Sequence, residues 1–342
     1  MRSFSLAVFV CSTLAGIVSA TADDSCQPLS IVTSVALKIG ADNRAYVPVK
    51  INGVAKSMLV DTGGFFTEMT QPVADELKLS PRHTRLVLVG VAGDSTRLAV
   101  RAGFTLGNLH ADSMDFMVMP GVHKFAPDVP DVAGLLAPNL LDAYDVDFDF
   151  GGHKFNLISQ KHCDGKVVYW PAGKVAVVPV RVNQDGHIMV PVELEGRRLT
   201  AMLDTGSSRS LLNLGPAQSN FGIVADSDQT PFEGHIGDTG ASTYLHRFKS
   251  LSLEGIAISN PTLMLIPDLM HNRLKPHDTL EGNSRIGNPG QETGLSEMIL
   301  GMDILRHLHL YVAYGEQKLY ITPAAPTPAP SPPPAKAPAQ SK

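Results

Sequence analysis

The chain has 342 residues, of which 44% are hydrophobic and 18% charged, and its formal net charge is −5. This length suits two domains or one bilobal unit, and the abundance of Gly (30) and Pro (25) is typical of a turn-rich β protein. The negative charge gives no electrostatic reason to expect nucleic acid or an anionic membrane as a partner.

Residues 1–20 have the pattern of an export signal. Arg2 precedes a mostly apolar run over residues 6–18, and Val18-Ser19-Ala20 is a small-residue cleavage pattern. The alternative is an uncleaved membrane anchor, but the run is shorter than the roughly 20 residues that a span needs. We therefore expect an exported protein with no stable membrane insertion once the signal is removed.

Two cysteines remain after such a cleavage, because Cys11 is lost with the signal. An even pair in an oxidising compartment predicts one disulfide, between Cys26 and Cys163. Two unpaired thiols are the alternative. Residues 21–44 form an N-terminal extension that could act as a pro-segment.

The first half of the chain begins with alternating apolar residues at 46–51, which predict a half-buried strand. The apolar run 57–60 then leads into Asp61-Thr62-Gly63. A short helix is expected over residues 71–79, starting near Thr70. An apolar block at 135–141 follows, with a helical turn at 140–144.

The second half repeats the first. Residues 47–53 match residues 190–196, and Asp61-Thr62-Gly63 matches Asp204-Thr205-Gly206, both at a separation of 143. The blocks that close each half match at a separation of 164, with a second helical turn at 304–309. We place the additional residues of the second half in a polar surface loop at 271–293. Residues 161–187 connect the halves, and the Pro/Ala-rich residues 323–342 are expected to be a disordered tail.

The duplicated Asp-Thr-Gly turn points to paired carboxylates. One such tripeptide is weak evidence, but here an apolar strand leads into each copy, and Gly63 and Gly206 permit a tight turn. Two carboxylates a few ångströms apart cannot both ionise cheaply, so they share one proton. The ionised member can then activate a water as general base, while the protonated member polarises a carbonyl.

With these motifs, the chain resembles the aspartic peptidase superfamily, and within it the retropepsin-like branch. Each half contains an apolar run ending in Asp-Thr-Gly, a Gly-rich segment and a closing apolar block. The resemblance implies an all-β fold of two retropepsin-like lobes, residues 45–160 and 188–322, related by a pseudo-two-fold axis. It also implies an aspartic endopeptidase that acts on polypeptides as a monomer, without metal or cofactor. Similar exported bacterial proteins make the periplasm the first expectation, and the extracellular space the second.

The resemblance assigns roles to the residues around the turns. Asp61 and Asp204 would be catalytic, and Thr62 and Thr205 would hydrogen-bond across the interface between the lobes. The remaining support would come from the backbone N–H groups of Gly63 and Gly206 and from Ser207, which could bond the outer oxygen of Asp204.

A third Asp-Thr-Gly, at residues 238–240, lacks an apolar strand before it. Its surroundings match a Gly-rich segment of the first half, so both are expected to be flap tips that fold over a bound peptide. The flap residues are Gly90, Gly93, Asp94, Gly234, Gly237 and Asp238. The alternatives are ordinary surface hairpins, or a catalytic role for Asp238.

Parts of the sequence also suggest other functions. A retropepsin-fold protein that binds extended peptides without cleaving them is the main alternative, because Gly64 cannot play the part of Ser207, and Ala137 replaces the family's glycine. An active dimer is a second alternative. A metal site at His307 and His309 lacks a third ligand, and Ser207 lacks the Gly-x-Ser-x-Gly setting of a serine hydrolase.

Overall fold

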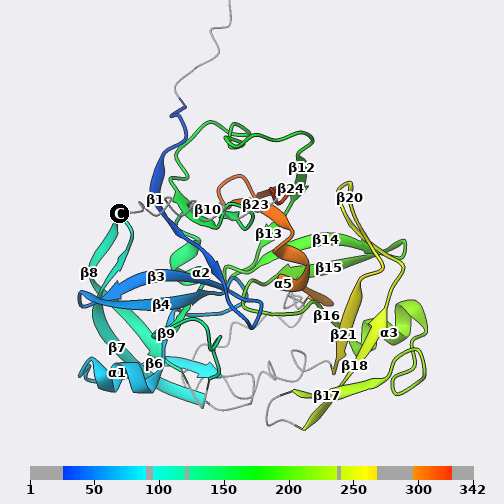
Figure 1. The fold of residues 1–342 in the computed structure, drawn as a ribbon, viewed down its shortest axis with the longest axis horizontal. Coiled ribbons are helices and arrows are strands. Elements are labelled where there is room, and N and C mark those ends of the chain that lie inside the picture. Colours follow the sequence, from blue (N-terminus) through cyan, green and yellow to red (C-terminus); the bar gives the residue numbers. More distant parts are fainter. Residues whose placement is uncertain (1–25, 90–94, 120–122, 237–239, 268–295, 326–342) are drawn as a thin grey trace, which may run out of the picture.

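The computed structural model describes residues 26–89, 95–119, 123–236, 240–267 and 296–325. Strands account for 51% of the described residues and helices for 8%, which confirms the all-β prediction. Figure 1 shows two β-rich lobes side by side, with a third sheet above and between them in this view.

The first lobe contains a sheet of eight strands within the described residues. In sheet order these are β2 (Lys38–Ile39), β3 (Ala45–Ile51), β4 (Val54–Val60), β9 (Val132–Leu136), β5 (Glu68–Met69), β8 (Leu109–Val118), β7 (Ser95–Leu106) and β6 (Arg82–Val89). Strand β4 runs parallel to β9, whereas β5 is antiparallel to β9. The end of β4, at Val60, therefore lies beside the apolar block of the same half.

The second lobe repeats this arrangement in a ten-stranded sheet. Its strands are β17 (Phe232–Ile236), β18 (Ala241–Arg247), β21 (Thr262–Ile266), β16 (Leu211–Asn213), β22 (Met298–Leu300), β15 (Arg197–Leu203), β14 (Ile188–Leu194), β19 (Ser250–Leu253) and β20 (Ile256–Ser259), with β13 (Arg181–Val182) beside β14. As in the first lobe, β15 is parallel to β22, which is antiparallel to β16.

The third sheet joins the lobes, and the sequence did not predict it. Its order is β1 (Ile31–Ala36), β11 (Lys154–Ile158), β10 (Asp145–Asp149), β23 (Leu308–Ala313), β24 (Lys318–Pro323) and β12 (Ala176–Pro179). The central pair, β10 with β23, joins the end of one half to the end of the other. Strand β1 comes from the expected extension and β12 from the expected connection, so both segments are integral parts of the fold.

The helices are short and follow the repeat. Helix α1 (Gln71–Glu76) begins after Thr70, whose hydroxyl accepts the Val73 N–H. Helices α2 (Pro138–Leu141) and α5 (Met302–Leu305) follow the two apolar blocks. Helix α3 (Leu214–Phe221) is the second-half counterpart of α1, which the sequence reasoning overlooked. It ends at Gly222, whose φ of 66° suits a residue without a Cβ.

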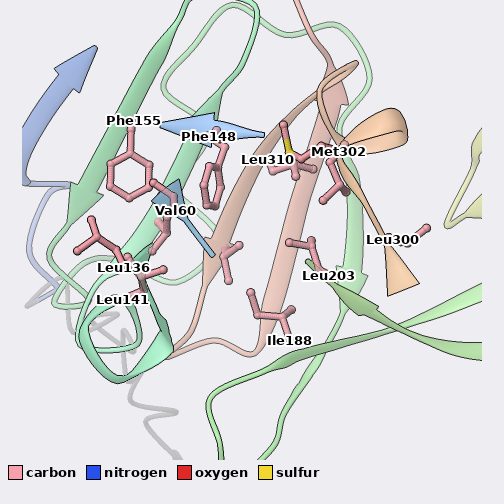
Figure 2. Packing of buried hydrophobic residues seen from close by; sticks show 14 of the residues in the cluster. Val60, Leu136, Leu141, Phe148, Phe155, Ile188, Leu203, Leu300, Met302 and Leu310 are labelled. Atoms are coloured by element: carbon pink, nitrogen blue, oxygen red, sulfur yellow. The ribbon is translucent and has the colours of Figure 1, made fainter. Parts of the chain in front are cut away.

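One continuous apolar core connects the lobes with the third sheet. Val60, Leu136 and Leu203 come from the strands behind the two Asp-Thr-Gly turns, and Phe148 and Leu310 come from the paired strands β10 and β23. Figure 2 shows these side chains gathered between the strands of this core. Since interiors are close-packed, the core resists displacement of either turn.

The connection between the lobes packs on the outer face of the third sheet. Trp170 stacks on His309 with ring centroids 4.0 Å apart, and its ring N–H donates to Thr322. Cys26 and Cys163 form a disulfide with a Cα–Cα distance of 4.9 Å. The disulfide attaches the start of the described chain to the beginning of this connection.

Buried carboxylates of β10 pair with histidines. His162 donates from Nε2 to Asp145 at 2.6 Å, and His309 donates from Nε2 to Asp147 at 2.7 Å. His309 is thus a structural residue. Within the described ranges, no group of three or more His, Cys, Asp or Glu side chains is placed to hold a metal ion.

Candidate active site

The two Asp-Thr-Gly turns meet at the interface between the lobes. Strand β4 delivers Asp61 and β15 delivers Asp204, and each aspartate is fixed through its backbone to the neighbouring apolar block. The N–H of Asp61 donates to the Leu136 carbonyl at 2.9 Å, and that of Asp204 donates to the Leu300 carbonyl at 2.9 Å. Equivalent backbone hydrogen bonds therefore hold the two turns in the two halves.

The two threonines form a reciprocal hydrogen-bond network across the interface. The Thr62 hydroxyl donates to the Leu203 carbonyl at 2.7 Å and accepts the Thr205 N–H at 3.1 Å. The Thr205 hydroxyl donates to the Val60 carbonyl at 2.6 Å and accepts the Thr62 N–H at 3.2 Å. Both threonines are fully buried. Because a buried polar group without a partner is costly, this network strongly favours one relative position of the turns.

The glycines of the turns serve both carboxyls. The Gly63 N–H donates to Asp61 Oδ1 at 3.0 Å, and the Gly206 N–H donates to Asp204 Oδ1 at 2.8 Å. Each glycine also packs against the carboxyl of the other half. A Cβ at Gly63 would lie 2.6 Å from both carboxyl oxygens of Asp204, and a Cβ at Gly206 would lie 2.7 Å from Asp61 Oδ2. Only a residue without a side chain fits at either position.

The carboxyls of Asp61 and Asp204 lie next to each other, and each affects the pKa of the other. Burial raises the pKa of both groups, and the charge of Asp61 raises the pKa of Asp204 further. The backbone N–H of Gly63 opposes the effect of burial at Asp61. A pair in this arrangement shares one proton and titrates as a unit. It can offer a general base and a general acid at the same time.

The support around the pair differs between the halves. Ser207 donates its backbone N–H to Asp204 Oδ1 at 3.1 Å, whereas its hydroxyl donates to the Arg209 carbonyl at 2.7 Å. The expectation that this hydroxyl bonds the outer oxygen of Asp204 is therefore wrong for this structure. At the equivalent place Gly64 also offers a backbone N–H to Asp61, so the missing side chain removes no hydrogen bond to the carboxyl.

Ala137 fits into the first half without loss of the equivalent contacts. Its N–H donates to the Thr67 hydroxyl at 3.2 Å, just as the Gly301 N–H donates to the Ser210 hydroxyl at 3.0 Å. A Cβ at Gly301 would lie 2.9 Å from the Ser210 nitrogen, so the second half has no room for one. In the first half, a Cβ at Gly64 would lie 3.4 Å from the Ala137 methyl, which is an ordinary contact, so the two positions are neighbours.

Contacts between the lobes that the sequence reasoning missed also hold the turns. The buried His187 donates from Nε2 to the Gly64 carbonyl at 3.0 Å, and Asn43 donates from Nδ2 to the Ser208 carbonyl at 3.0 Å. Each donor lies just before the first main strand of its half, β3 or β14. This position in the repeat was the only signal that could have identified them.

Hairpins lie where the flaps were expected. Strand β6 pairs with β7, and β17 pairs with β18, both antiparallel. Gly234 lies within β17 beside a break in register, not at the tip of the hairpin. The other flap residues, Gly90, Gly93, Asp94, Gly237 and Asp238, lie outside the described residues, as does the loop at 271–293. Of the aspartates in the Asp-Thr-Gly motifs, the described structure brings together Asp61 and Asp204.

The model of the Aspartyl protease family matches residues 47–139 and 190–304, together more than half of the chain. The chain therefore belongs to the aspartyl protease family. No curated protein matches it. Among solved structures, the aspartic proteinase from Irpex lacteus aligns with 86% of this chain and 98% of its own, at 14% sequence identity and a TM-score of 0.48. No helix in the described ranges is long and apolar enough to cross a membrane.

Proposed function

We propose that this protein is an aspartic endopeptidase in which Asp61 and Asp204 form the catalytic dyad. The observation that carries the proposal is the placement of two half-buried, adjacent carboxyls by the reciprocal threonine network. Each half of the chain supplies one carboxyl, so a single chain contains a complete dyad and can act as a monomer.

The chemistry follows from the shared proton. The ionised member of the pair takes a proton from a water molecule, which attacks the carbonyl carbon of the scissile peptide bond. The protonated member donates a hydrogen bond to the carbonyl oxygen and later helps protonate the leaving amine. The pair titrates as a unit, so the roles of base and acid belong to the dyad and not to one named aspartate.

The substrate is an extended polypeptide. The hairpins β6–β7 and β17–β18 offer strand edges that can bond to the main chain of a peptide. The Cys26–Cys163 disulfide supports an oxidising compartment, in agreement with an export signal at residues 1–20. The periplasm is our first expectation for the location and the extracellular space the second.

The test is cleavage of a diverse peptide pool by the purified protein from acidic to neutral pH, with Asp61→Asn and Asp204→Asn in parallel. Asp226→Asn is the matched control, because Asp226 is exposed and lies at φ 56°, which asparagine tolerates. Loss of cleavage in each dyad variant but not in the control supports the proposal. If the folded wild-type protein cleaves nothing at any pH, peptide binding without catalysis becomes the better function.

A further inference from the structure

A third carboxyl, that of Glu68, lies close to the dyad on the wall of the first lobe. In β5, Glu68 pairs with Leu135 of β9 on one side and with Met117 of β8 on the other. Met69, the next residue, is fully buried in the main core. Because successive side chains of a strand point to opposite faces, Glu68 faces away from that core, toward the same side as Leu135 and Met117.

Glu68 is only 7% exposed, yet its carboxyl has no hydrogen-bond or ion-pair partner among the described residues. Within these residues, the Tyr314 hydroxyl is the one side-chain polar atom that is both sealed from solvent and unpaired. The unpaired Glu68 carboxyl must therefore reach solvent-accessible space. Burial, and then the negative charge of Asp61, raise the pKa of Glu68 to about 8. Without a ligand its carboxyl is therefore mostly protonated near neutral pH, and a cation placed beside it would lower the pKa and ionise it.

The internal repeat shows what stands at the same place in the second lobe. Leu211 follows Asp204 at the distance at which Glu68 follows Asp61. In β16, Leu211 pairs with Ile299 of β22, the counterpart of Leu135. Both Leu211 and Ile299 are half-buried. The two walls beside the dyad therefore match in backbone and differ in chemistry, with an acid on one side and an aliphatic residue on the other.

We propose that Glu68 is a specificity-determining residue that binds a lysine or arginine side chain of the substrate near the scissile bond. The wall at Leu211 would take an apolar side chain on the other side of that bond. This inference rests on the proposed function, because it names the substrate class of that same site.

The chemistry of the wall fits a long cationic side chain. Leu135 and Met117 beside Glu68 are themselves buried and supply an apolar surrounding, and the Glu68 carboxyl is the group with which the charged end can pair. The described protein supplies no cation of its own there. Arg44, which acts electrostatically on Asp61, is already bound to Asp42 at 2.7 Å and to the Lys124 carbonyl at 2.8 Å. A substrate cation would therefore be the missing partner of Glu68.

The experiment compares lysine with norleucine, which has a similar stem but no charge. A set of short peptides with either residue at each position in turn is assayed for cleavage, with kcat/KM as the readout. Uncleavable reduced-amide versions of the same peptides are assayed for binding by calorimetry. The proteins are the wild type, Glu68→Gln and Glu68→Leu. Glu254→Gln, at the exposed turn between β19 and β20, is the matched control. Thermal melts establish that each variant is folded.

We expect the wild type to prefer lysine over norleucine at one position next to the scissile bond. This ratio should fall at least about tenfold in both Glu68 variants and stay unchanged in Glu254→Gln. A ratio that does not change in a folded Glu68 variant overturns the inference. If nothing is cleaved but the uncleavable peptides show the preference and its loss, the inference stands and the proposed catalysis fails. If no peptide shows a lysine preference in either assay, Glu68 does not select the substrate.

Discussion

Substitution of Gly63 by alanine tests whether the turns are as tightly interlocked as the structure indicates. The new methyl group would lie 2.6 Å from both carboxyl oxygens of Asp204. Ordinary contact needs a separation of about 3.5 Å, so the methyl or the carboxyl must move by about 1 Å. The carboxyl cannot swing away freely, because the N–H groups of Gly206 and Ser207 hold it at 2.8 and 3.1 Å.

A displacement of this size at a catalytic group costs on the order of a hundredfold in rate, which corresponds to about 2.7 kcal/mol in the activation free energy. We expect kcat of Gly63→Ala to fall by roughly this factor, with a loss of about 1–3 kcal/mol in the free energy of unfolding from overpacking. Steady-state kinetics and thermal melts measure the two effects. Gly173→Ala is the control, because a Cβ there would meet no atom within 4 Å. A Gly63→Ala variant with wild-type kcat would refute this description of the dyad.

Three further perturbations probe the surrounding structure. Thr62→Val removes the donor to the Leu203 carbonyl, and chemical denaturation should show a loss of about 1–3 kcal/mol. Reduction of the Cys26–Cys163 disulfide, which spans 137 residues, should cost about 2–5 kcal/mol, seen as a lower melting temperature with reductant. At His162, burial lowers the pKa, but the hydrogen bonds to Asp145 and to the Cys163 carbonyl and the charges of Asp145 and Glu316 together outweigh it, so the pKa is raised. This stabilisation is complete below the unfolded pKa of 6.5 and is lost as pH rises through the folded value. Melting temperatures across that range should fall more steeply for the wild type than for His162→Ala.

The sequence predicted the parts of the fold that leave a local or a repeated signal. Alternating apolar residues indicated β3 and β14, and Thr70 indicated the start of α1. The constant separation of the Asp-Thr-Gly copies put Asp61 and Asp204 in equivalent places. The same separation maps Gln71 onto Leu214, the first residue of α3, so the repeat also contains a signal for that helix.

The third sheet left no such signal. Strands β10 and β23 pair across 160 or more residues, for example Phe148 with Leu310, and nothing near either strand specifies its partner. The sequence also could not show that the Ser207 hydroxyl bonds the Arg209 carbonyl, since side-chain direction depends on the local turn. The repeat places Leu211 at the position of Glu68 in the second half. Only the structure shows that the Glu68 carboxyl is largely buried and unpaired.

Because the two halves are joined in one chain, the sequence of each half can change independently of the other. In an assembly of two identical chains, any substitution appears on both sides of the axis and must be acceptable on both. Here the first half contains Gly64 with Ala137 and the second contains Ser207 with Gly301, where no Cβ fits. One half can therefore change to bind a new ligand while the other half keeps the packing that positions its Asp-Thr-Gly turn.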